Sequence, residues 1–299
     1  MLKTNLKPQV QVAIFFAITQ ILGIFSGMVL FNSVAANPEL KDFSVAPLAP
    51  NDPANAVFFL VYILFGAGVV LLAGRLFKGA RFFQLLEIMV IASASSIVFL
   101  AIGLYMGLDF ITAILVSGVA GASLAALKFF VSEIKNTAAI ISSAGVAAIF
   151  GFSLGFLPTA IFVILLSIYD YIAVFKTKHM IEMARELSTR QLSFAVTAKN
   201  VPARMPKEKT EVYVERAMRE GERLDLGTGD LSVPGMMSVS AFTLGANGPI
   251  YAAAIAIGST ISIYLLLEFV AKKRVFLPAL PPICFGGMLS LLIVKLLGF

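Results

Sequence analysis

The stretch LPTAIFVILLSIYDYIAVFK, residues 157–176, decides the class of fold. It is long and apolar enough to cross a membrane, and it carries a single acidic residue, Asp170. About 20 apolar helical residues, rising 1.5 Å each, cover the roughly 30 Å of bilayer hydrocarbon. A carboxylate inside such a segment is costly and indicates a functional site. The sequence therefore predicts a membrane protein with chemistry inside the bilayer.

The composition of the whole chain agrees with that class. Of 299 residues, 59% are hydrophobic and 13% are charged, whereas about a quarter are charged in ordinary soluble domains. We expect an all-α, polytopic integral membrane protein with about nine transmembrane helices. The expected spans are 9–32, 56–74, 82–104, 109–129, 137–154, 157–176, 227–246, 249–271 and 276–297.

The basic residues predict the orientation of these helices, because Lys and Arg concentrate in cytoplasmic loops. In the nine-helix arrangement, all of the 23 Lys and Arg residues except Lys41 and Lys295 fall on one side. The protein is therefore expected in the cell membrane, with its amino terminus on the inside, facing the cytoplasm, and its carboxyl terminus on the outside. Topology and anionic lipid explain the net charge of +6, so nucleic-acid binding is not indicated.

A polar stretch divides the chain into three parts. Residues 1–178 are expected to form a six-helix bundle, residues 179–225 a cytoplasmic loop, and residues 226–299 a three-helix part. Within the loop, opposite charges four residues apart predict a helix over 208–223. The loop is interpreted either as a substrate gate or as a solvated connector.

Residue counts exclude several kinds of chemistry. One cysteine, Cys284, allows no intramolecular disulfide, and one histidine, His179, cannot build a His-rich zinc site. Residues 151–155, GFSLG, have the spelling of a serine-hydrolase motif. They lack the strand-to-helix turn and the histidine base that this motif requires. We interpret them, and Cys284, as packing residues.

Other features have ordinary structural interpretations. The glycine pairs Gly23/Gly27 and Gly103/Gly107 are expected to let neighbouring helices approach closely. Glu87 lies near an inner boundary, beside basic residues, and is expected to be a snorkelling or solvated surface group.

A second acidic residue, Asp230, lies at a depth similar to that of Asp170. The expected span 157–176 reaches the cytoplasmic face near Lys176, and Asp170 lies about 9 Å of helix before that end. The next span leaves the same face near Asp225, and Asp230 lies roughly 7–10 Å beyond it. Because sequential helices are often neighbours, the two carboxylates can meet. A close pair shares a proton, so one group can activate water while the other polarises a peptide carbonyl.

The backbone around Asp230 is expected to be irregular, because glycines precede it and Pro234-Gly235 follow it. Residues 278–282, PALPP, are expected to begin the last span as irregular chain, since proline disfavours helix before it.

Three short motifs occur in order on three late spans: Tyr169-Asp170, Gly227-Thr228-Gly229-Asp230 and Pro278-Ala279-Leu280. They resemble the YD, GxGD and PAL motifs of presenilins and signal peptide peptidases. The resemblance implies an intramembrane aspartyl protease, similar to a self-contained microbial homologue, with Asp170 and Asp230 as the catalytic pair. It further implies that site-shaping or substrate-binding roles fall to a larger set: Tyr169, Gly227, Thr228, Gly229, Pro278, Ala279 and Leu280.

The same resemblance implies transmembrane-helix proteins as substrates and the lipid bilayer as the medium. The two-carboxylate chemistry calls for no metal and no organic cofactor. Obligatory protein subunits are not implied, and a homo-oligomer is compatible with the sequence.

Other functions stay open at this point. Paired intramembrane aspartates on broken helices also suit a proton- or cation-coupled transporter or channel, although the first half holds no inverted repeat of the motifs. A prepilin-type peptidase shares the GxGD spelling, but Leu231 and Ser232 stand where that family has a basic residue nearby. A membrane scaffold would leave the matched aspartates unexplained.

Overall fold

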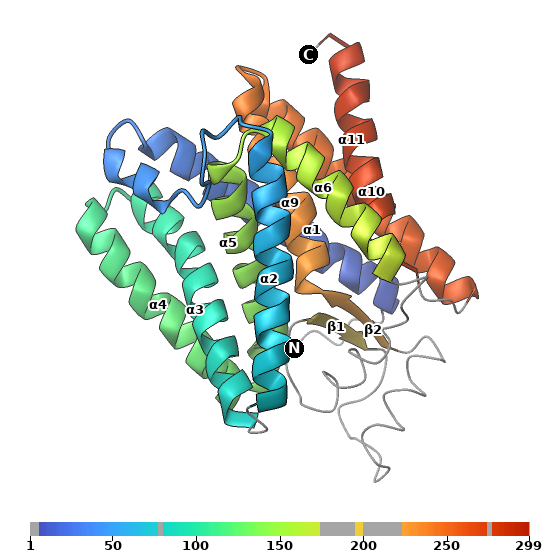
Figure 1. Ribbon diagram of the computed structural model, residues 1–299, viewed down its shortest axis with the longest axis horizontal. Coiled ribbons are helices and arrows are strands. Elements are labelled where there is room, and N and C mark those ends of the chain that lie inside the picture. Colours follow the sequence, from blue (N-terminus) through green and yellow to red (C-terminus); the bar gives the residue numbers. More distant parts are fainter. Residues whose placement is uncertain (1–5, 77–79, 174–194, 200–222, 274–276, 299) are drawn as a thin grey trace.

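The computed structural model describes residues 6–76, 80–173, 195–199, 223–273 and 277–298. Within these residues, every apolar segment expected from the sequence contains an α-helix (Figure 1). The helices are α1 (Pro8–Ser33), α2 (Ala54–Leu76), α3 (Ala80–Tyr105), α4 (Phe110–Phe130), α5 (Lys135–Ser153), α6 (Phe156–Ile172), α9 (Thr228–Ser240), α10 (Gly248–Lys273) and α11 (Leu280–Leu296). The 3-10 helices are η1 (Pro38–Phe43), η2 (Ser132–Ile134) and η4 (Ala241–Leu244), and the strands are β1 (Ala195–Lys199) and β2 (Arg223–Gly227).

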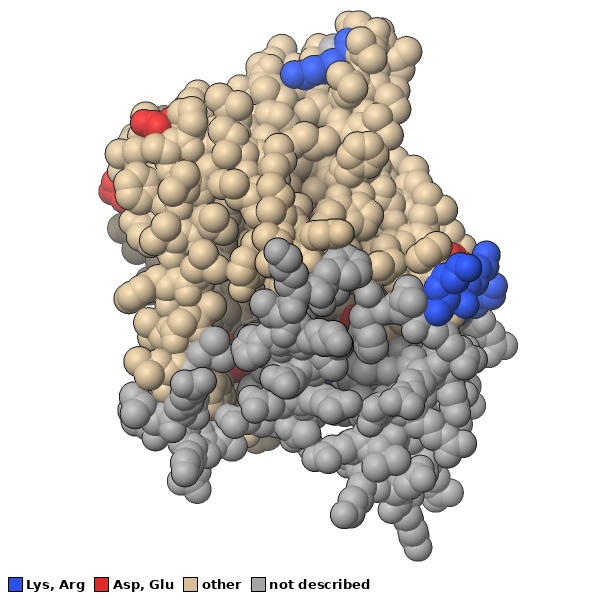
Figure 2. Space-filling model, turned by 45° about the vertical axis from the view of Figure 1, so that its right-hand side comes forward, with Lys and Arg blue, Asp and Glu red and all other residues tan. Residues whose placement is uncertain are grey.

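Five of these helices, α1, α3, α4, α5 and α10, are long and apolar enough to cross a membrane. Helices α2, α6 and α11 contain shorter apolar stretches. Figure 2 shows a broad surface without Lys, Arg, Asp or Glu, with charge at its margins. Such a surface suits contact with lipid, so the chain is an integral membrane protein.

Helices α5 and α9 lie in the middle of the bundle. Helix α5 packs against α1, α3 and α9, and α9 also packs against α1 and α10. Helices α3 and α4 form one flank, and α6, α10 and α11 lie on the other side (Figure 1). The first turn of α9, which carries Asp230, is therefore held by helices from both halves of the sequence.

Small residues allow these central helices to approach. A Cβ atom at Gly23 of α1 would lie 3.4 Å from the Cβ of Ala147 in α5, and one at Gly27 would clash with Val239 of α9. Gly151 of α5 faces the same Val239 side chain, at 2.5 Å from an added Cβ. The packing interpretation of Gly23, Gly27 and Gly151 is confirmed.

The same interpretation holds for only one member of the pair Gly103/Gly107. Gly103 faces Ala113 of α4, with 3.4 Å between their Cβ positions. Gly107 has a positive φ of 81° in the turn after α3, and an added Cβ would meet nothing within 4 Å. The expectation for Gly107 is wrong, because a left-handed turn rather than a close approach requires glycine there.

The helix expected over 227–246 is interrupted in the structure. Helix α9 begins at Thr228 and ends at Ser240, and η4 follows it. Pro234 lies inside α9, and Gly245 has a φ of 104° just after η4. Helix α9 continues through Pro234, and the positive φ of Gly245 prevents a regular helix from continuing to residue 246.

The two-stranded sheet was not predicted. Strands β1 and β2 are antiparallel, and their register pairs Val196 with Leu226 and Thr197 with Asp225. Val196, Ala198 and Leu226 are buried in one cluster with α1 side chains. The helix predicted over 208–223 lies outside the described residues except for Arg223, which begins β2.

A side chain of α5 binds the outer edge of β1. The amide of Asn136 donates to Thr197 O at 2.8 Å and accepts from Thr197 N at 3.1 Å. Since antiparallel residues alternate in the direction of their N–H and C=O groups, Val196 and Ala198 are the β1 residues that bond across to β2. The sheet is thus docked at a fixed height against α5.

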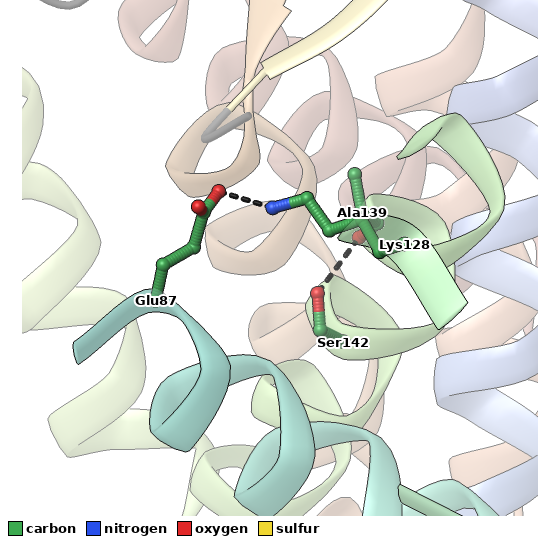
Figure 3. A network of polar contacts seen from close by, with 4 residues as sticks. All are labelled: Glu87, Lys128, Ala139 and Ser142. Atoms are coloured by element: carbon green, nitrogen blue, oxygen red, sulfur yellow. Dashed lines mark hydrogen bonds and ion pairs between the residues drawn. The ribbon is translucent and has the colours of Figure 1, made fainter. Parts of the chain in front are cut away.

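Glu87 and Lys128 form a buried ion pair between α3 and α4 (Figure 3). Their side chains are 2% and 3% exposed, beside the turn of α5 where Ser142 donates to Ala139 O. The expectation that Glu87 is a surface group is wrong. The packing of α3 on α4 brings Lys128 to it, although 41 residues separate them.

Removing one charge of this pair should destabilise the bundle. In Glu87→Gln, the Lys128 ammonium loses its buried counter-charge, and the expected loss is roughly 3–5 kcal/mol. Thermal unfolding in detergent measures it, with Glu133→Gln at an exposed position as the control. The double variant Glu87→Gln/Lys128→Met should recover most of the loss. A single variant as stable as the parent would contradict this assignment.

Candidate active site

Three element ends meet at one place in the structure. Asp170 lies two residues before the end of α6, Asp230 lies in the first turn of α9, and Leu280 begins α11. Helix α6 packs against both α9 and α11, and α9 also packs against α11. The packing therefore brings the three motif segments together from positions up to 110 residues apart.

The two carboxylates lie near each other. Asp170 is 9% exposed, and Asp230 is partly buried. They are close enough to interact electrostatically, and both also interact with the Cys284 thiol on α11. Among the described residues, Asp170 Oδ2 has no hydrogen-bond partner, although it is buried. A buried acceptor of this kind can bind water or a substrate group.

Each carboxylate faces a backbone N–H at the end of an element. The N–H of Leu280 interacts with Asp170, and the N–H of Gly227 interacts with Asp230. Backbone donors at the ends of elements have no helical partner of their own, so they are available for such contacts.

The proline-rich start of α11 explains why Leu280 provides this donor. Ala279 is the N-cap of α11, and Pro281 and Pro282 have no N–H to give. The next N–H, that of Ile283, bonds to Ala279 O at 3.4 Å. Leu280 is therefore the single residue of the first turn that can present an N–H to Asp170. The irregular chain predicted over 278–282 is confirmed only at Pro278 and Ala279. It is wrong for 280–282, because α11 begins at Leu280 and proline fits the first turn of a helix.

The two glycines of the GTGD motif have different surroundings. A Cβ at Gly227 would lie 3.2 Å from Asp230 Oδ2, whereas one at Gly229 would meet nothing within 4 Å. Only Gly227 has extended backbone, because α9 already begins at Thr228. The irregular backbone expected through Gly229 thus ends two residues earlier. The carbonyl of Thr228 accepts a hydrogen bond from Ser232 Oγ at 2.7 Å.

An apolar groove of about 470 Å³ runs between α6 and α11, and it reaches Cys284, which interacts with both carboxylates. Its lining includes Ile168 and Tyr171 of α6 and Phe285 of α11. Tyr169, which the YD motif had singled out, is 49% exposed and does not line this groove. Its neighbour Tyr171 does, because α6 turns that side chain toward α11.

Cys284 and Ser167 are groove residues that the sequence analysis did not place there. Cys284 is buried, as expected for a packing residue, but it also lines the groove and contacts Ser167 across the α6–α11 interface. No periodicity or motif distinguishes Ser167 from other small polar residues of membrane helices. Among the described residues, no cluster of three His, Cys, Asp or Glu side chains could hold a metal ion.

A family model described as signal-peptide peptidase, presenilin aspartyl protease, matches residues 12–298. The chain belongs to this family. It is an intramembrane aspartyl protease, and the transporter, prepilin-peptidase and scaffold alternatives are set aside.

Solved structures agree with the fold of this protease. A presenilin family intramembrane aspartate protease in space group C222 gives a TM-score of 0.66 at 23% identity, covering 97% of this chain and 100% of that chain. One in space group P2 gives 0.60 at 24% identity, covering 94% and 97%. No curated protein matches the chain.

The glycines of the GTGD motif offer a matched pair of substitutions. Gly227→Ala should push the Asp230 carboxylate aside by a few tenths of an ångström and lower kcat about tenfold or more. Gly229→Ala adds a methyl group to open space, so kcat should stay within about twofold. Steady-state cleavage of a reporter transmembrane helix measures both. Equal kcat values for the two variants would contradict the contact at Gly227.

Proposed function

We propose that Asp170 and Asp230 are the catalytic pair of this protease, and that it hydrolyses peptide bonds within transmembrane helices. One observation carries the proposal: carboxylates from α6 and α9 lie together, Asp170 facing the N–H of Leu280 on α11 and Asp230 facing the N–H of Gly227, the N-cap of its own helix. Fixed donors orient a carboxylate without occupying all of its oxygens. An orphan acceptor on Asp170 then remains for water or substrate.

In this reaction, one carboxylate takes a proton from a water molecule, whose oxygen attacks the scissile carbonyl carbon. The other carboxyl group gives its proton to the carbonyl oxygen, so a gem-diol forms. The C–N bond then breaks as the nitrogen receives the first group's proton, and the second group recovers its own from the diol. The proton belongs to the pair, so neither residue is assigned the acid role.

The groove between α6 and α11 is the proposed path of the substrate helix to the carboxylates. Its apolar lining suits a transmembrane segment, and Tyr171 and Phe285 stand on its two walls. The PAL segment leads into α11, with Pro278 and Ala279 before the helix and Leu280 as its first residue, and there it would shape the site.

The cleaved segment must unwind, because a helix hides its carbonyl groups in internal hydrogen bonds. We infer that it pairs as an extended chain with backbone near residues 227–229 and 278–280. Strand β2 supports this, since it ends at Gly227, three residues before Asp230.

The topology is proposed on the same basis. The chain would cross the membrane nine times, with its amino terminus inside and its carboxyl terminus outside. This arrangement would place Lys272 and Lys273 in the cytoplasm and Lys295 outside. Residues 1–178 and 226–299 would be the membrane parts, joined by the cytoplasmic loop 179–225. The mechanism uses the cell-membrane bilayer and one chain, without a metal, an organic cofactor or a further subunit.

Removal of either carboxylate tests the catalytic assignment. Asp170→Ala and Asp230→Ala should each lower cleavage of a reporter transmembrane helix by on the order of 10³-fold or more, because the pair acts as a unit. The assay uses purified protein in lipid, with thermal unfolding to show that both variants fold. A folded variant that still cuts at the parent's rate would refute the assignment.

The role of the PAL segment has its own test. Pro278→Ala and Leu280→Ala should each reduce cleavage by roughly tenfold while expression stays normal, because both side chains are buried where α11 meets Asp170. Leu289→Ala, at an exposed position of the same helix, is the control. Unchanged cleavage in both PAL variants would count against substrate pairing at this segment.

A further inference from the structure

A glutamine in the middle of α1 reaches the helix that carries Asp230. The Gln20 side chain is 1% exposed, and its Nε2 donates to Leu231 O at 3.1 Å. Leu231 directly follows Asp230 in the first turn of α9. The two partners are 211 residues apart, so the contact exists only because α1 packs on α9.

The first turn of α9 needs an external anchor, because Pro234 weakens its own hydrogen bonding. In a regular helix the N–H of residue 234 would bond to the carbonyl of Asp230, and a proline cannot provide it. Proline also tilts the turn before it. The carbonyl of Asp230 therefore lacks its helical partner, and the turn that carries it is held by one helical bond fewer.

The amide of Gln20 contacts α9 on both sides of this proline. Beyond its bond to Leu231 O, its Oε1 lies 3.5 Å from Ser238 Oγ, whose proton also faces Pro234 O at 3.1 Å. A Cβ at Gly235 would lie at ordinary contact distance, 3.5 Å, from Gln20 Oε1. That Cβ would also lie 2.7 Å from Ala147 Cβ, so α1, α5 and α9 are fitted together here.

We propose that Gln20 is a positioning residue, which fixes the rotation of the first turn of α9 and so aims the Asp230 carboxylate at Asp170. The inference rests on the proposed catalytic role of the two aspartates. Gln20 acts from the α1 side and is not among the residues of the groove between α6 and α11. It touches neither the substrate path nor the reacting atoms, and its effect passes through the Leu231 carbonyl.

This placement predicts a particular kinetic signature. Gln20→Met keeps the volume of the side chain and removes its donor and acceptor. The kcat for a reporter helix should fall by roughly 10- to 100-fold, as expected when a buried hydrogen bond that orients a catalytic group is lost. KM should stay within about twofold of the parent, because the substrate groove is untouched.

The neighbouring residue provides a matched control. Thr19 is also fully buried on α1, but its hydroxyl donates to Phe15 O of its own helix at 2.9 Å. Thr19→Val should therefore keep the parent's kcat. A second variant, Gln20→Asn, retains an amide that is one methylene too short for Leu231 O, and it should lose kcat as Gln20→Met does.

The outcomes separate positioning from packing. The proposal is supported if kcat, and not KM, falls in both Gln20 variants and stays at the parent's value in Thr19→Val. The thermal unfolding midpoints of the variants should lie near the parent's. Parental kcat in either Gln20 variant overturns it, as does an equal loss in Thr19→Val. Asp230→Ala is assayed in parallel. If that variant still cuts, the catalytic assignment itself fails, independently of Gln20.

Discussion

Two carboxylates inside a hydrophobic bundle are stable only where fixed polar groups face them, and this requirement governs the structure around the site. The donors are backbone N–H groups of Gly227 and Leu280. Both stand where an element begins or ends, which is where the backbone has a donor to spare. The strand before Asp230 and the proline-rich start of α11 are thus parts of the site as much as the aspartates are.

The bundle is tight on one side of the pair and open on the other. Around α9, Gly27 of α1 and Gly151 of α5 meet Val239 so closely that a methyl group would not fit. On the far side, α6 and α11 leave an apolar groove. Close packing around the helix that carries Asp230, with an apolar groove on the other side, suits a protease for membrane helices. Such an enzyme must align its reacting groups and also admit a bulky substrate.

The buried pair Glu87 and Lys128 shows that charge also serves the scaffold. It joins α3 to α4 at the flank, away from α6 and α11, and no step of the proposed reaction uses it. A buried ion pair contributes little stability relative to apolar residues but strongly disfavours any packing that separates its members. It therefore fixes how α3 and α4 are paired beside α5.

The sequence by itself determined the membrane class, the positions of the apolar helices, and Asp170, Asp230 and the PAL segment as the residues of interest. The class, the helices and the aspartates follow from properties of single segments: the length of an apolar run and the cost of a carboxylate within it. The PAL segment was indicated by its resemblance to a motif of presenilins and signal peptide peptidases. Only the tertiary structure decided the ion partner of Glu87, the sheet, the N–H groups that face the aspartates and the anchor at Gln20. Each joins segments distant in the chain, and it depends on the rotation and height at which helices pack, which no local pattern specifies.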